Sequence, residues 1–169
     1  MRREGRRARF ATMSQLKVEF DQPEHGWLKL ELRSEEVLLS DTFSHIYPTL
    51  PNLCDALCAL ASGSYSRPVV FLLEPQELEL SFTSHEDQKC IVNVVRFADR
   101  GRDSRNREVA FAYSGPSREV VLSFWRALRQ LQTCLTEDDF TTSWGEPFPA
   151  HEMAALTAAV ERIKSGKQI

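Results

Sequence analysis

The sequence has 169 residues, of which 42% are hydrophobic and 27% charged, the proportions of an ordinary globular protein rather than a disordered or fibrous one. The length suits a single domain with a substantial core. No apolar stretch approaches the roughly 20 residues that cross a bilayer, and the basic first residues lack the apolar core of a secretory signal. We therefore expect a cytoplasmic protein without a membrane segment.

Charge is unevenly distributed between a short N-terminal segment and the rest of the chain. Residues 1–12 contain five arginines and one acid, which gives +4, and because the formal total is −3, residues 13–169 carry −7. Such a tail could bind nucleic acid or anionic lipid, or it could be a solvated extension ahead of Met13. It is short and lacks the apolar periodicity of a membrane anchor. We interpret it as a flexible basic extension before one domain, residues 13–169.

Two short segments near the N-terminus alternate between apolar and polar residues. The alternation covers residues 16–20 and 27–32 and predicts strands with one face on a core and the other in water. Residues 21–26 between them have the composition of a turn, which favours a hairpin. Residues 36–40 add a short third strand.

The hydrophobic period changes over residues 48–63. Leucines at positions 50, 53, 57 and 60 form one stripe of an amphipathic helix. Pro48 and Pro51 suit its first turn, where missing N–H groups cost little, and Gly63 suits its end.

Strand patterns then return, followed by two helical patterns. Four apolar segments separated by turn residues cover residues 69–73, 77–82, 90–97 and 109–113, and short strands in succession favour an antiparallel meander. Stripes at helical spacing run from Val121 to Leu135 and from Met153 to Ile163. The order is ββ(β)–α–ββββ–α–α. We predict an α+β fold in which an antiparallel sheet of about six or seven strands carries the helices on one face.

The common catalytic and cofactor motifs are absent from the sequence. It contains no glycine-rich phosphate loop, nucleophile elbow, HExxH pattern or EF-hand loop. The four cysteines include no CxxC pair. Cys54 and Cys58 lie one helical turn apart and suit a packed helix face better than a metal or redox pair. We therefore predict no metal and no cofactor.

Glu74 is the most suggestive single residue, because it ends the apolar run of residues 69–73 and precedes Pro75. A carboxylate at the end of a buried strand can be a general acid, and a small enzyme that uses Glu74, Cys54 or His45 is one alternative function. A general acid also needs a second titratable group close by. Because proline interrupts a strand ladder, we interpret Glu74 as the residue where a strand enters a turn.

An arginine-rich segment, residues 96–107, supplies a second alternative. Its five arginines could grip phosphates together with the N-terminal tail and make the chain a nucleic-acid binder. Asp99, Asp103 and Glu108 weaken the positive field, and the aromatic residues that single-strand binders interleave with their basic residues are missing. We interpret the segment as a mixed-charge hairpin loop.

Residues 136–148 combine acids with aromatic residues in a predicted linker between two helices. The candidate partner-binding residues are Glu137, Asp138, Asp139, Phe140, Trp144 and Glu146, and Glu77 and Glu79 form a secondary acidic face on a strand turned to water. Aromatic anchors ringed by acids suit docking on a basic protein surface. The alternative is that the aromatic side chains fold back onto the core.

The stretches HGWLKLEL, FSHIYPTLPNLCDALCAL and VVFLLEPQELELSF resemble small uncharacterised bacterial α+β proteins, some of the kind that serve as immunity partners of secreted toxins. The resemblance covers roughly residues 25–97 in spacing and residue types, and it transfers no site residue. It implies a non-catalytic domain that neutralises a protein partner. The acidic charge is compatible with a basic partner such as a nuclease. We therefore expect a cytoplasmic protein-binding domain.

Overall fold

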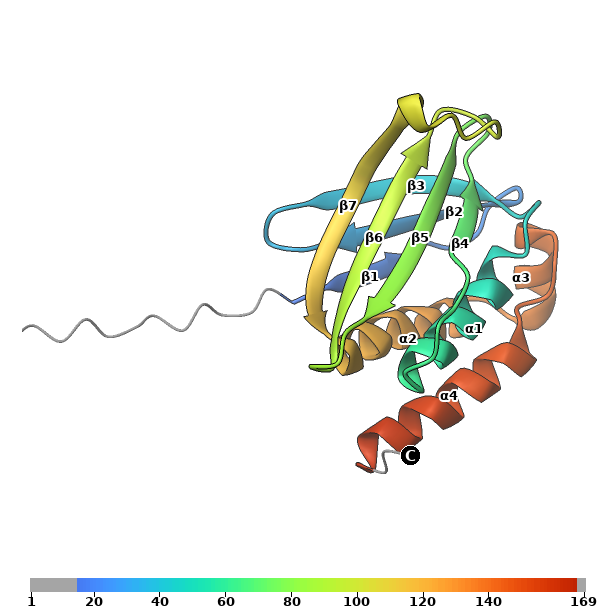
Figure 1. The fold of residues 1–169 in the computed structure, drawn as a ribbon. Coiled ribbons are helices and arrows are strands. Elements are labelled where there is room, and N and C mark those ends of the chain that lie inside the picture. Colours follow the sequence, from blue (N-terminus) through green and yellow to red (C-terminus); the bar gives the residue numbers. More distant parts are fainter. Residues whose placement is uncertain (1–14, 167–169) are drawn as a thin grey trace, which may run out of the picture.

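The computed structural model describes residues 15–166, which form seven strands, four α-helices and one short 3-10 helix (Figure 1). The strands are β1 (Lys17–Phe20), β2 (Trp27–Arg33), β3 (Leu38–Ser44), β4 (Val69–Leu72), β5 (Glu77–Ser84), β6 (Lys89–Phe97) and β7 (Arg107–Pro116). The helices are α1 (Thr49–Ala61), η1 (Ser104–Asn106), α2 (Ser117–Thr133), α3 (Glu137–Trp144) and α4 (Ala150–Lys164). The expected extension, residues 1–12, lies outside the described residues. Within residues 15–166 no helix is long and apolar enough to cross a bilayer.

The seven strands form two antiparallel sheets, which corrects the single sheet that we predicted. β1, β2 and β3 pair in chain order, and β4, β5, β6 and β7 form a second sheet, also in chain order. The α+β class is confirmed, but the single sheet is wrong, because the chain leaves β3 through α1 and returns in a separate sheet. The two sheets meet through side chains, and Phe43 of β3 packs edge to face on Phe71 of β4 with ring centroids 4.8 Å apart.

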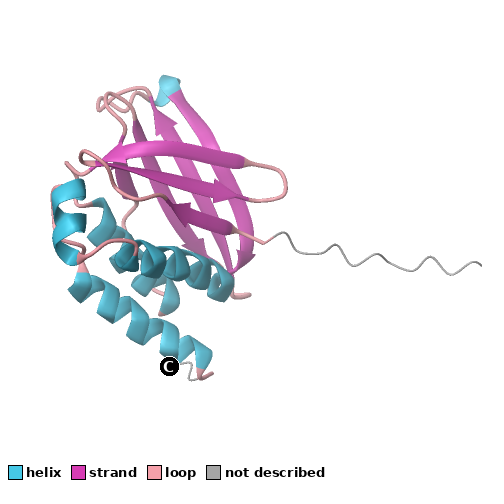
Figure 2. Cartoon of the chain, turned by 180° about the vertical axis from the view of Figure 1, so that it is seen from behind, coloured by secondary structure: helices cyan, strands magenta, loops and turns pink. Residues whose placement is uncertain are grey.

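The sheets and helices enclose one core. The three-stranded sheet lies across one face of the four-stranded sheet, α1 and α2 lie beside it at one end, and α4 packs on α1 and α2 from outside (Figures 1 and 2). A continuous cluster of buried side chains includes residues from both sheets and from all four α-helices. The opposite face of the four-stranded sheet is left for loops and solvent.

The predicted strand and helix patterns agree with the burial of the side chains. The alternating leucines of β2 at positions 28, 30 and 32 are all buried, as are the four leucines of α1. Burial of one such side chain contributes up to about 1.5–3 kcal/mol, so a one-residue slip of β2 would expose three of them and move charged residues inward. The hydrophobic pattern therefore fixes the register of this strand.

Helix α3 corrects a second prediction, because residues 136–148 were expected to form a linker without helical structure. The Thr136 side chain caps the helix by accepting from the Asp139 amide at 3.1 Å. Acids in the first turn interact favourably with the positive end of the helix dipole. Gly145 ends the helix with a left-handed φ of 103°, and its amide donates to the Thr141 carbonyl. Both caps are thus encoded locally, although the helix is only eight residues long.

Candidate functional site

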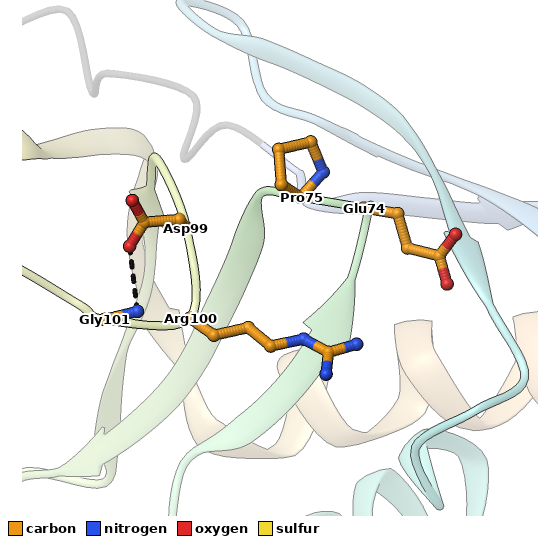
Figure 3. A pocket seen from close by; sticks show the side chains of 5 residues that line it. All are labelled: Glu74, Pro75, Asp99, Arg100 and Gly101. Atoms are coloured by element: carbon orange, nitrogen blue, oxygen red, sulfur yellow. Dashed lines mark hydrogen bonds between the residues drawn. The ribbon is translucent and has the colours of Figure 1, made fainter.

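A pocket lies where the β4–β5 turn meets the β6–β7 loop. It is an open hollow of about 450 Å³, lined by Glu74, Pro75, Asp99, Arg100 and Gly101, all of which are exposed (Figure 3). Asp99 accepts a hydrogen bond from the Gly101 amide at 2.8 Å, which closes the loop on itself. Glu74 has a left-handed backbone with a φ of 54°, a conformation that residues other than glycine adopt at a cost. We call this hollow the turn pocket.

Beside the turn pocket, a hydrogen-bonded network surrounds Glu77, whose side chain is 3% exposed. Tyr47 donates its hydroxyl to one carboxylate oxygen at 2.6 Å, and the Arg102 Nε donates to the other at 2.7 Å. Arg102 also reaches Glu79, at 2.7 Å. Glu77 was predicted to face water. The correction is that Tyr47 and Arg102 cover this end of β5, so Glu77 is buried and Glu79 is paired.

The network sets the ionisation of its members. Burial alone would raise the pKa of Glu77, but hydrogen bonds from Tyr47 and Arg102, with the charges of Arg102 and Arg100, outweigh burial and lower it. The hydrogen bond to Glu77, followed by burial, raises the pKa of Tyr47. Glu77 is therefore held ionised and Tyr47 neutral near pH 7, which makes this cluster an anchor for the β6–β7 loop.

The arginines of residues 96–107 differ in whether an acid neutralises them. Arg96 pairs with Asp41 of β3, Arg102 with the two glutamates of β5, and Arg105 with Asp103. Arg100 instead lies over the Tyr47 ring, 5.8 Å from its centroid. Among residues 15–166 it forms no hydrogen bond and no ion pair. Arg100 is thus an exposed cation at the pocket wall that no described acid pairs with directly, although its charge acts on the nearby Glu77 carboxylate.

Residues 45–48 join β3 to α1, and we call them the connector. Their side chains link the surroundings of the turn pocket to α3. The His45 ring lies so close to Gly26 and Gly145 that a methyl group added at either glycine would come to 3.0 Å from it, and its centroid is 6.0 Å from that of Trp144. The Gly26 amide donates to the Ser143 carbonyl at 2.8 Å. Tyr47, two residues further on, belongs to the Glu77 network. Side chains of one short segment therefore touch both regions.

Replacing Gly145 by alanine is expected to destabilise the protein by about 1–3 kcal/mol. Alanine disfavours the φ of 103° and its methyl group would press on the His45 ring. Gly63→Ala is the matched control, because Gly63 has a φ of 69° with open space around it. Its substitution should lower the free energy of unfolding only through the strained backbone conformation, without a steric contact. Urea denaturation of both variants measures the difference, and equal losses would show that His45 does not restrict this position.

The predicted partner-binding residues of α3 separate into a buried and an exposed set. Phe140 and Trp144 lie in the core, and the aromatic anchors that we expected on the surface are therefore not available there. Glu137, Asp138, Asp139 and Glu146 are exposed. The reason is helix periodicity, because positions 140 and 144 lie one turn apart on the face toward β2 and β3.

The three residues of the enzyme alternative lie in different parts of the fold. Cys54 is buried on α1, His45 packs beside α3, and Glu74 lines the turn pocket. Burial first, then the nearby Cys58 and acids, raises the pKa of the Cys54 thiol to about 12, whereas a nucleophilic cysteine needs a lowered one. Among the described residues no group of three or more histidines, cysteines or acids is arranged to hold a metal ion.

Sequence reasoning did not single out Tyr47, and it named Arg100 and Arg102 only as members of the arginine-rich segment over residues 96–107. Tyr47 lies 30 residues before Glu77 and Arg102 lies 25 residues after it, so no local spacing in the sequence predicts that they meet. Ile46 is 56% exposed although its neighbours in the chain are half-buried. The available signal was the aromatic and proline-rich sequence around the connector, which is typical of a constrained loop.

Comparison of the chain with protein-family models, with curated proteins and with solved structures finds no match.

Proposed function

We propose that this chain is a non-catalytic protein-binding domain whose partner presents a basic surface, as an immunity protein binds the toxin that it neutralises. The proposed contact surface is the outer side of α3 together with the connector. We call it the α3 face, and it consists of Glu137, Asp138, Asp139, Glu146 and Ile46.

One observation carries this proposal: α3 and the residues just after it display four exposed carboxylates that form no ion pair with any cation of residues 15–166. These residues contain 23 acids against 15 lysines and arginines, a formal charge of −8. On the strands, Glu31, Asp41, Glu77 and Glu79 each have an arginine or lysine beside them, whereas the acids of the α3 face are left for solvent or a partner. Unneutralised charge of one sign steers the approach of a protein of opposite charge.

The acids are held on a rigid support. Phe140 and Trp144 fix the inner side of α3 in the core, and Phe140 packs edge to face on Phe148 with centroids 5.5 Å apart. A preorganised surface loses less conformational entropy on binding than a flexible linker does. Ile46 adds exposed apolar area on the connector, next to the residue that contacts the end of α3. An apolar contact beside charged groups is a common composition for an interface.

The nucleic-acid alternative has less support. Three of the five arginines in residues 96–107 are already ion-paired inside the domain. Phosphate binding would have to break these pairs or act through the few remaining cations.

The test is partner capture followed by reconstitution with the purified partner. A triple variant, Glu137→Gln with Asp138→Asn and Glu146→Gln, removes three charges and leaves the cap formed by Thr136 and Asp139 intact. We expect it to raise the Kd by about tenfold or more, with a weaker dependence on salt. The matched control, Glu35→Gln with Glu36→Gln and Glu86→Gln, removes three exposed acids at turns remote from α3 and should bind as the native chain does. Unchanged affinity of the first variant, or an acidic partner, would contradict the proposal.

A further inference from the structure

We infer that the turn pocket binds a small zwitterion, a molecule with one ammonium and one carboxylate group such as a free amino acid. This site is independent of the α3 face and of any protein partner. Its two principal contacts are Arg100 for the carboxylate and Glu74 for the ammonium. Both residues line the same hollow, on walls supplied by the β6–β7 loop and the β4–β5 turn.

Arg100 has the properties of a carboxylate receptor. Its guanidinium carries five N–H donors, and no described residue accepts from any of them. The Tyr47 ring supports it from one side. A planar guanidinium in this state can bind a carboxylate through two parallel hydrogen bonds. The neighbouring arginines at positions 96, 102 and 105 cannot do so, because acids of the domain already occupy them.

Glu74 supplies the opposite charge. Its side chain is exposed and forms no ion pair with a described residue. Figure 3 shows the Glu74 carboxylate and the Arg100 guanidinium on the same side of the pocket, while the Asp99 carboxylate lies on the other side against the Gly101 amide. No ion pair joins the two groups, so a molecule with one charge of each sign can interact with both.

The walls of the pocket are fixed before any ligand arrives. Arg102 fastens the β6–β7 loop to β5 through Glu77 and Glu79. The turn is closed by the Leu73 amide, which donates to the Gln76 carbonyl at 2.8 Å. The hollow has a volume of about 450 Å³ and is open to solvent, because all of its lining residues are exposed. The open shape and the two unpaired charges of opposite sign together favour a compact polar ligand.

The experiment is a titration of the full chain, labelled with ¹⁵N, followed by amide chemical shifts. The probes are glycine, β-alanine and 4-aminobutyrate, which hold the two charges at increasing separation, and acetate and methylammonium are the single-charge controls. We expect saturable shifts at Gln76 and Gly101 with a Kd on the order of 1 mM for at least one zwitterion. The single-charge probes should bind at least about tenfold more weakly. No saturable shift with any zwitterion up to about 50 mM would overturn the inference.

Two variants locate the contacts. Arg100→Gln and Glu74→Gln should each weaken binding of the best zwitterion by about tenfold or more. Arg107→Gln and Glu86→Gln, which change exposed residues outside the pocket, should leave it unchanged. The spectrum of each variant shows directly whether it is folded, and the titration of the native chain does not depend on any variant. Native-like affinity in both pocket variants would place the ligand elsewhere and overturn the assignment.

Discussion

Replacing Trp144 by alanine is expected to lower the free energy of unfolding by about 3–5 kcal/mol. Trp144 is 3% exposed and packs edge to face on Phe43 with ring centroids 5.6 Å apart. Its removal leaves a cavity between α3 and the three-stranded sheet, and Phe43, which also contacts Phe71 of the second sheet, loses one of its two aromatic neighbours. Urea denaturation followed by far-ultraviolet circular dichroism, which does not depend on the lost tryptophan, measures the effect.

Asp138→Asn on the same helix serves as the control. Its side chain is exposed, so a change within about 0.5 kcal/mol is expected. A loss below about 1 kcal/mol for Trp144→Ala would contradict the buried position of the indole. The contrast has a practical consequence for binding work, because a loss of binding in Trp144→Ala would report unfolding of the surface, whereas the variants at the exposed acids report the surface itself.

The second large effect is expected for Glu77→Gln, which should destabilise the protein by about 2–4 kcal/mol at pH 7. The substitution keeps the shape of the side chain and removes its charge. It leaves the donors of Tyr47 and Arg102 facing an amide that carries only one acceptor oxygen. Arg102 is about one-third exposed and can regain water, which keeps the cost below that of a fully buried pair. Glu79→Gln, at a more exposed partner of the same arginine, should cost less.

The pH dependence of the Glu77 effect follows from the direction of its pKa. The folded-state pKa is lowered from 4.5, so the unfolded chain binds the proton more readily. The contribution of Glu77 is therefore complete above pH 4.5 and is lost as the pH falls through the lower, folded pKa. The difference in stability between the native chain and Glu77→Gln should shrink over that acid range. A difference that is constant from neutral to strongly acidic pH would show that the carboxylate charge is not what stabilises the site.

Much of the secondary structure could be predicted because it depends on the local pattern of apolar and polar residues. The alternation in β2 and the leucine stripe of α1 lie on the faces where they were expected. The division into two sheets could not be predicted, because alternation reports which face of a strand is buried and not which strand lies beside it. Helix α3 was missed although Thr136 and Asp139 form its cap, since eight residues are too few to show a hydrophobic period.

The candidate sites were less predictable than the fold. Glu77 lies on the strand face that alternation assigns to water, and only Tyr47 and Arg102, 30 residues before it and 25 after it, bury the carboxylate. The free state of Arg100 depends in the same way on which acids its neighbours reach. Counting charges along the sequence reveals neither the burial of Glu77 nor the absence of an ion pair at Arg100, because ion pairing depends on positions in space.

The separation of the two sheets has a consequence for how the chain can be divided. Every strand pair within residues 15–166 joins segments of the same half, because residues 17–44 complete one sheet and residues 69–116 complete the other. The segment over residues 62–68, after α1, is almost entirely exposed. The backbone hydrogen bonding of the sheets is thus modular, and the halves are joined by side-chain packing and a few polar contacts such as Asp41 with Arg96. Each sheet therefore completes its backbone hydrogen bonds within one continuous stretch of sequence.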